Sequence, residues 1–346
     1  MNSKTITTLV FSLFAVLLLT AAETPSPALL VLNKTDTTLA IVDPATLKVV
    51  ATVPTGQDPH EVVASADGKL AFVSNYGGFG VGLQTLAVID LVAQKPLPPV
   101  ELGGLRAPHG ITWADGKVFF TAEANKAIAR YDPSTHQIDW VLGLGQNRTH
   151  MIVVSKDFNQ IFTSNVNSDS ISIIERTPAA GARGGRGGGG RGGTAGSEWN
   201  VSHVRVGRGP EGFDLSPDGK EVWAANSGDG TVSVVDVAQK SVSQTFSAGT
   251  GTSNRLKFST DGKLVLISDL RLSDLVVFDA ARRAELKRIF LGAGSTGILM
   301  QPDGARAFVA VGSQNGLAVI DLKTLEVTGR IETGRGPDGM AWAVRN

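Results

Sequence analysis

A short sequence pattern that recurs about every 42 residues constrains this chain of 346 residues more than any other feature. Each copy contains a Gly-rich turn, a polar residue, an apolar stretch, an Asp-Gly step and a second apolar stretch. Gly56–Asn75 and Gly207–Asn226 are two clear copies. The polar residue after the turn occurs seven times, as His60, His109, His150, Glu211, Asn254, Thr296 and Asp338. Self-similarity of this period predicts a fold built from seven equivalent units.

Each unit holds four short apolar stretches separated by turn residues, a pattern that predicts four β-strands. Seven units of four strands are typical of a seven-bladed β-propeller whose blades are four-stranded antiparallel sheets. The Asp-Gly step fits a hairpin between the first two strands, because Asp bonds nearby backbone and Gly accepts a positive φ. The predicted fold class is therefore all-β.

The two ends of the repeat region predict how the ring closes. The region enters at Ala28–Asn33, which has the pattern of a second strand of a blade and not of a first. The missing first strand is found at the other end, in Gly339–Val344. We therefore expect one blade to combine three N-terminal strands with the C-terminal strand, which closes the ring and hides two sheet edges.

Three predicted strands are each followed by an apolar stretch that ends in an acidic residue. These strands are Ala71–Asn75, Phe162–Asn165 and Val222–Asn226. These repeats resemble the YVTN-type β-propeller repeat, and the resemblance covers nearly the whole chain after residue 22. Relatives of this type include surface and periplasmic propellers, lactonase-like enzymes, streptogramin-lyase-like enzymes and cofactor-bearing electron-transfer propellers. The resemblance thus implies the fold without naming a reaction.

Residues 1–22 have the pattern of a secretory signal peptide. Lys4 supplies a positive charge, Leu9–Leu19 is apolar, and Thr20–Ala22 is a small-residue cleavage site. The apolar stretch is shorter than the roughly 20 residues that span a bilayer, so we expect cleavage before Glu23 and no transmembrane segment in the mature chain. Residues 23–346 would then form the propeller domain of a periplasmic or secreted protein.

Composition excludes several classes of protein. The chain has 32 Lys+Arg and 32 Asp+Glu, and this balance argues against a general affinity for nucleic acids; no specific nucleic-acid partner is expected. It has no Cys, which excludes disulfides, thiolate metal sites, iron–sulfur clusters and thiol nucleophiles. Any metal ion would therefore be held by His and carboxylate side chains.

Residues 178–196 form a Gly/Arg-rich insertion between the third and fourth strands of one predicted blade, and ten of the sixteen residues 181–196 are Gly. This composition predicts a disordered loop, on the face opposite the Gly-Pro turns. The loop could be a tether to nucleic acid or to an anionic envelope polymer, which would permit contact with the cell envelope. Because it carries only three Arg in an otherwise neutral chain, a tolerated loop insertion is the favoured interpretation.

The innermost strand of each propeller blade lines the central channel, so the seven polar residues are expected to ring one channel mouth. His60, His109 and His150 occupy three consecutive blades, and Glu211 follows on the fourth. Three imidazoles and a carboxylate match the ligand set of a divalent ion such as Zn, Fe, Cu or Ni. Glu123 is predicted to end a second strand, at a position where most other blades carry Asn. It is a candidate catalytic acid or base, a further metal ligand, or a hydrogen-bond partner of an imidazole. The alternative is that these histidines are ordinary polar residues at a wet channel mouth.

Arginines are expected on the same face of the ring. Four lie in the Gly-Pro turns and one follows Asn254: Arg106, Arg148, Arg208, Arg335 and Arg255. Arg148 and Arg255 are predicted to lie nearest the channel, and with Asn254 and Asp338 they could hold a small anionic molecule. Most of these arginines could instead be solvated and paired with nearby carboxylates.

Three functions remain open on this basis. The first is an exported propeller that binds a small anionic molecule or a protein partner at the channel mouth. The second is a metal-dependent lyase or lactonase-like enzyme, in which the three histidines and Glu211 hold the ion, Glu123 acts as acid or base, and Arg255 anchors the substrate. The third is an envelope or surface structural protein attached through residues 178–196. The sequence leaves open whether the protein is an enzyme.

Overall fold

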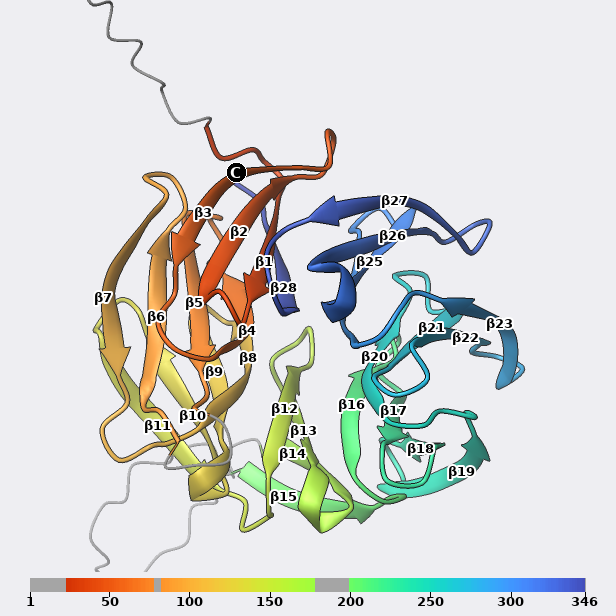
Figure 1. The fold of residues 1–346 in the computed structure, drawn as a ribbon. Coiled ribbons are helices and arrows are strands. Elements are labelled where there is room, and N and C mark those ends of the chain that lie inside the picture. The colour runs from red at the N-terminus through yellow and green to blue at the C-terminus, as the bar shows by residue number, and fades with distance from the viewer. Residues whose placement is uncertain (1–22, 78–81, 178–198, 346) are drawn as a thin grey trace, which may run out of the picture.

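The computed structural model describes residues 23–77, 82–177 and 199–345. The predicted signal peptide and the Gly/Arg-rich insertion lie outside these ranges. Within them, 28 strands form seven separate four-stranded sheets arranged around a central axis (Figure 1). The all-β, seven-bladed propeller fold is confirmed. No helix in the described part of the chain is long and apolar enough to cross a membrane.

The blades are numbered here in chain order. Blade 1 contains β28 (Pro337–Ala343), β1 (Ala28–Asn33), β2 (Thr38–Asp43) and β3 (Lys48–Pro54). Blade 2 contains β4 (Pro59–Ala64), β5 (Leu70–Asn75), β6 (Thr85–Asp90) and β7 (Lys95–Glu101). Blade 3 contains β8 (Pro108–Ala114), β9 (Lys117–Ala122), β10 (Ala127–Asp132) and β11 (Gln137–Gly143). Blade 4 contains β12 (Thr149–Val154), β13 (Gln160–Asn165), β14 (Ser170–Arg176) and β15 (Trp199–Arg205).

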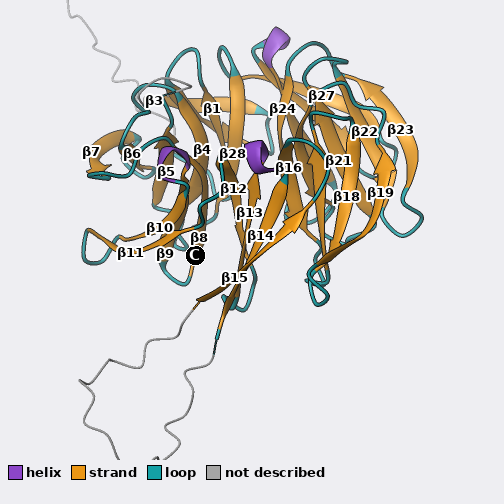
Figure 2. Cartoon of the chain, turned by 90° about the horizontal axis from the view of Figure 1, so that it is seen from below, coloured by secondary structure: helices purple, strands orange, loops and turns teal. Residues whose placement is uncertain are grey.

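The last three blades follow the same order from the channel outward. Blade 5 contains β16 (Pro210–Leu215), β17 (Glu221–Asn226), β18 (Thr231–Asp236) and β19 (Ser241–Ser247). Blade 6 contains β20 (Ser253–Phe258), β21 (Leu264–Asp269), β22 (Asp274–Asp279) and β23 (Ala284–Phe290). Blade 7 contains β24 (Ser295–Met300), β25 (Arg306–Val311), β26 (Gly316–Asp321) and β27 (Glu326–Glu332). Short 3-10 helices follow the second strands of blades 3, 4 and 7 (Figure 2): η1 (Glu123–Asn125), η2 (Val166–Ser168) and η3 (Gly312–Gln314).

Position within a blade explains the composition of each strand. The second and third strands are covered on both faces by neighbouring blades, and β2, β6 and β18 read as nearly continuous apolar runs. The outermost strands face solvent on one side, and β11 alternates exposed and half-buried residues along its whole length. This difference follows from the period of two residues along a strand, which sends successive side chains to opposite faces.

The hydrophobic core is divided among the seven blade interfaces. Each of seven clusters of buried apolar residues combines side chains from two adjacent blades. Large buried side chains such as Phe72, Phe162 and Trp223 lie in these clusters. Since burying a large apolar side chain contributes roughly 1.5–3 kcal/mol, the contacts between blades hold the ring together without disulfides.

The ring closes as expected from the two ends of the repeat region. β28 pairs with β1 in an antiparallel register that places Ala343 opposite Ala28 and Trp342 opposite Leu29. The indole Nε1 of Trp342 donates a hydrogen bond of 2.8 Å to the carbonyl of Met300 in blade 7. The C-terminal strand therefore completes blade 1 and also contacts the blade that precedes it in the ring.

Glycines allow the innermost strands to approach one another closely near the axis. A Cβ atom added to Gly212 in β16 would lie 2.6 Å from the Cα of Arg255 in β20. One added to Gly339 in β28 would lie 2.3 Å from the carbonyl oxygen of His60 in β4. Both distances are far shorter than an ordinary contact, so glycine at this position sets the spacing of the inner strands.

Candidate functional site

The seven polar residues of the repeat form one ring, because each is the second residue of the innermost strand of its blade. A cavity of about 300 Å³ lies at this level of the channel. Of the predicted site residues, eight line it: His60, His109, Arg148, His150, Glu211, Asn254, Arg255 and Asp338. Lys34, Asp58 and Tyr76 also line it, and the sequence analysis had not singled them out as site residues.

Three inner strands carry a long side chain at their third residue, Glu61, Met151 and Arg255, and of these Arg255 lines the cavity. The guanidinium of Arg255 in β20 is buried and pairs with the carboxylate of Glu61 in β4. Its Nη1 atom also lies 2.9 Å from the sulfur of Met151 in β12. Arg255 therefore links blades 6, 2 and 4 at the cavity.

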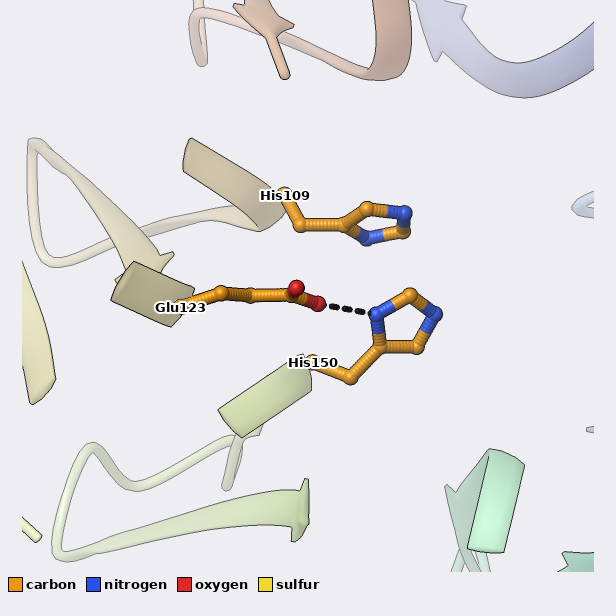
Figure 3. A group of neighbouring side chains, drawn as sticks. All are labelled: His109, Glu123 and His150. Carbon is orange, nitrogen blue, oxygen red and sulfur yellow. Dashed lines mark hydrogen bonds and ion pairs between the residues drawn. The ribbon is translucent and has the colours of Figure 1, made fainter. Parts of the chain in front are cut away.

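The histidines form one contiguous group on blades 2, 3 and 4. The ring centroids of His109 and His150 are 3.7 Å apart, and those of His60 and His109 are 4.9 Å apart. His109 and His150 are nearly fully buried, with 5% and 3% of their surfaces exposed. In Figure 3 the two imidazoles lie one above the other, and the carboxylate of Glu123 points toward them.

His150 is held between two carboxylates. Its Nδ1 atom is hydrogen-bonded to Oε1 of Glu123, and its Nε2 atom lies 3.0 Å from Oε1 of Glu211. Arg148, in the turn before β12, donates a hydrogen bond of 3.2 Å to the same oxygen of Glu211. These four side chains, from blades 3, 4 and 5, therefore form a continuous network of alternating charge in which His150 and Glu123 are buried.

The surroundings of the three imidazoles shift their pKa values in different directions. Burial opposes a charge on His150, but Glu211 and Glu123 outweigh it and raise its pKa to about 9. The pKa of His109 is held well below its ordinary value by burial and by the neighbouring positive charge of His150. Burial and the nearby Lys34 also lower the pKa of His60. At neutral pH, His150 is therefore an imidazolium, whereas His109 and His60 are neutral.

The carboxylate of Glu211 has the complementary shift. Burial disfavours its charged form, but the positive charges of His150 and Arg148 lower its pKa to about 2. On the other side of the cavity, Asp338 lies 3.2 Å from Nζ of Lys34 and 4.0 Å from Arg255. Those charges lower the pKa of Asp338 despite its burial. Both carboxylates are therefore ionised over the physiological pH range.

The position of Glu123 in its blade differs from the prediction. β9 ends at Ala122, which pairs with the start of β8, and Glu123 is the first residue of η1. The reason is the preceding hairpin, a two-residue turn in which Asp115 and Gly116 both have positive φ. Other blades have a longer connection here, such as Ser65–Lys69 in blade 2. Glu123 consequently lies one residue beyond the position that Asn occupies in most blades.

Three further residues occupy equivalent positions on neighbouring blades, and two of them, Lys34 and Tyr76, line the cavity. Lys34, Tyr76 and Glu123 each follow the last residue of a second strand, on blades 1, 2 and 3. Their backbone N–H groups donate to carbonyls of the turn that precedes the inner strand, those of Gly336, Asp58 and Ala107 respectively. The signal for Lys34 and Tyr76 was present in the repeat, because each directly follows the Asn that ends its strand.

The predicted arginines separate into two groups. Arg148 and Arg255 line the cavity, and both are paired with carboxylates there. Arg208 instead donates to the carbonyl of Gly228, and Arg335 pairs with Asp36 at 2.6 Å, while neither of them lines the cavity. The pairing of Arg255 with Glu61 matches the alternative considered for the arginines, in which carboxylates of the protein neutralise them.

Three of these side chains have the spacing of a metal-binding group. His109, Glu123 and His150 each offer one ligand atom, these atoms lie within 4.8 Å of one another, and all three residues are buried. The Nδ1 atom of His109 is buried and has no hydrogen-bond partner in the described part of the chain. This group shares His109 and His150 with the set predicted from the sequence. His60 and Glu211, the other predicted ligands, lie at its edges.

No protein-family model matches the chain, and no curated protein matches it. Several solved structures share its fold. A protein of unknown function from Desulfotomaculum acetoxidans aligns with a TM-score of 0.73 and 13% identity, over 93% of this chain and 100% of that chain. A protein provisionally named 6-phosphogluconolactonase from Bacteroides uniformis aligns with a TM-score of 0.70 and 17% identity, over 92% and 99%. Hydrazine synthase from Kuenenia stuttgartiensis aligns with a TM-score of 0.70 and 16% identity, over 90% and 100%. Such similarity shows the β-propeller fold alone.

Proposed function

We propose that this β-propeller binds one divalent transition-metal ion at its channel mouth and holds a small molecule at the open coordination positions of that ion. The observation that carries the proposal is the convergence of His109, Glu123 and His150, three buried side chains whose ligand atoms lie within 4.8 Å of one another. Imidazole nitrogen and carboxylate oxygen together suit Zn and its neighbours in the first transition series.

The unpartnered Nδ1 atom of His109 supports this proposal. A buried polar atom without a partner costs stability, and such atoms are often found at functional sites. Three protein ligands are typical of sites that leave a coordination position open for water or substrate. The adjoining cavity of about 300 Å³ is at the small end of the range for ligand pockets, and it is lined mainly by polar side chains.

The charges around the cavity also favour a cation. Five carboxylates of the described residues lie at or beside it: Asp58, Glu61, Glu123, Glu211 and Asp338. Three permanent cations face them, Lys34, Arg148 and Arg255. A metal-bound imidazole is neutral, so the metal-loaded site would have an excess of two negative charges apart from the ion. A divalent cation balances that excess.

Metal content and metal affinity test the proposal. Purified protein should contain close to one equivalent of a transition metal by elemental analysis, and metal-free protein should rebind Zn²⁺ in a calorimetric titration. His109→Ala and Glu123→Gln should each weaken this binding strongly. His203→Ala is the matched control, because His203 lies on β15 and contacts Ser172. Metal-free wild-type protein that does not bind Zn²⁺, Cu²⁺, Ni²⁺ or Fe²⁺ would refute the proposal.

Catalysis by the bound ion is a second candidate function, favoured by the cavity beside the metal-binding group. A metal ion polarises carbonyl oxygens and activates water, which suits hydrolysis of a lactone or a lyase reaction. Some structural neighbours carry a lactonase name, which makes lactones a reasonable first panel. Turnover that needs Zn²⁺ and disappears in Glu123→Gln would support this function. A panel without turnover, combined with confirmed metal binding, would leave binding as the function.

A further inference from the structure

We infer that Tyr76 is a positioning residue for the metal site, because its hydroxyl fixes the orientation of the Glu123 carboxylate relative to the two imidazoles. This inference rests on the proposed metal site and deepens it. Tyr76 is not itself assigned as a ligand; it acts through Glu123.

The two oxygens of the Glu123 carboxylate have different hydrogen-bond partners. The hydroxyl of Tyr76 donates a hydrogen bond of 2.6 Å to Oε2 of Glu123. The other oxygen, Oε1, is the one that contacts Nδ1 of His150. Only 8% of the surface of Glu123 is exposed, so water has little access to either oxygen. Without the Tyr76 hydroxyl, Oε2 would lose this hydrogen bond, and the orientation of the carboxylate would be set by the contacts of Oε1 with His150 and Arg148.

The aromatic ring of Tyr76 adds a second constraint. It meets the ring of His109 edge-on, with centroids 4.9 Å apart and planes at 87°. It also lies 4.7 Å from the ring of His60. Edge-to-face contact is a favourable arrangement for aromatic rings. Tyr76 therefore contacts one ligand through its hydroxyl and another through its ring, and both contacts restrict the geometry of the metal-binding group.

The propeller topology explains how the side chain of Tyr76 can contact both Glu123 and His109. Tyr76 follows β5 in blade 2, whereas Glu123 and His109 belong to blade 3. Tyr76 occupies the position in its blade that Glu123 occupies in the next, so the two side chains enter the cavity from adjacent sectors of the ring. The tyrosine reaches across the blade boundary, and the carboxylate it bonds is held between Tyr76 and His150.

Tyr76→Phe tests this inference because it removes the hydroxyl and keeps the ring. Groups that orient metal ligands typically contribute about 10–100-fold to metal affinity. We expect Tyr76→Phe to weaken Zn²⁺ binding by a factor in that range, as measured by competition with a chromophoric chelator. Tyr131→Phe is a matched control, since Tyr131 is the other of the two tyrosines in the chain and its hydroxyl contacts His136 at 3.2 Å. Its affinity should equal that of wild type.

Three further comparisons separate positioning from a general loss of structure. Affinities are compared at a temperature at which the circular dichroism spectra of all metal-free variants match that of wild type. Co²⁺-loaded Tyr76→Phe should show altered visible absorption bands, because these bands report ligand geometry. In a Glu123→Ala background, Tyr76→Phe should have no additional effect on the residual affinity, since the tyrosine acts through that carboxylate.

The possible outcomes are distinct. A selective loss of affinity in Tyr76→Phe supports the inference. If wild type binds Zn²⁺ and Tyr76→Phe binds it within twofold as tightly, the inference is wrong while the metal site stands. An equal loss in Tyr76→Phe and Tyr131→Phe would also overturn it. Failure of wild type to bind metal would instead refute the proposed function from which the inference starts.

Discussion

The imidazolium of His150 should make the stability of the metal-free protein fall as the pH rises above neutrality. An ordinary histidine has a pKa near 6.5, whereas the two carboxylates beside His150 raise its pKa to about 9 despite burial. Between these two pH values, the folded protein keeps a proton that the unfolded chain has released. The stabilisation is therefore fully present below pH 6.5 and is lost as the pH rises through 9.

The magnitude follows from the separation of the two pKa values. Each pH unit between them changes the free energy of unfolding by about 1.4 kcal/mol, so the total loss is about 3 kcal/mol. The side chain of His150 is only 4% exposed, so solvent screens this interaction little. His60 and His109 have lowered pKa values, so their effect on the free energy of unfolding has the opposite sign: it increases stability as the pH rises. This increase is complete near pH 6.5. It does not mask the decline above that pH.

Urea unfolding of chelator-treated protein between pH 6.5 and pH 9.5 measures this effect. Wild type should lose about 3 kcal/mol of unfolding free energy across the range. Glu211→Gln should have a shallower pH dependence, because one of the two carboxylates that stabilise the imidazolium is gone. His203→Gln should keep the wild-type slope. A flat wild-type profile, or a Glu211→Gln profile that parallels wild type, would refute the charge assignment.

The remaining predictions concern the Arg255–Glu61 ion pair, ring closure and export. Arg255→Met leaves Glu61, whose side chain is only 12% exposed, without this partner and should cost about 3 kcal/mol in urea unfolding. Adding Glu61→Leu should recover much of that loss, and no recovery would contradict the pairing. Deleting Gly339–Asn346 removes most of β28 and should cause aggregation, so a truncated protein that melts like wild type would rule out strand closure as a source of stability. When the chain is expressed in a bacterium with its N-terminus intact, the mature protein should begin at Glu23 by mass spectrometry; a product that retains residues 1–22 would contradict the signal peptide.

Much of the fold could be predicted because the repeat is encoded locally. Each blade requires apolar residues at the same spacing and turn residues at the same steps, so the period of about 42 residues indicates both the blade and the number of blades. The same periodicity predicts that His60, His109, His150 and Glu211 share one channel mouth, since equivalent positions in a ring lie at the same height. All four line the cavity.

The sequence was less informative wherever a blade departs from the average repeat. The two-residue turn at Asp115–Gly116 moves Glu123 one position beyond the strand end, and simple alignment of the Asp-Gly steps missed this shift. The repeat pattern was not used to identify Tyr76, although this residue directly follows the Asn that ends its strand. Its significance depends on the carboxylate of the next blade, 47 residues further along the chain.

The sequence by itself thus determined the blade architecture, the closure of the ring and the seven polar residues that begin the inner strands at the channel mouth. Only the tertiary structure decided which of those side chains pair. Arg255, expected to bind an anion, meets Glu61 from 194 residues away, and His150 lies between carboxylates from two neighbouring blades. The physical reason is that strand periodicity fixes the direction of a side chain relative to its own backbone, whereas distances across the channel depend on how seven blades pack around one axis. No local pattern in the sequence encodes those distances.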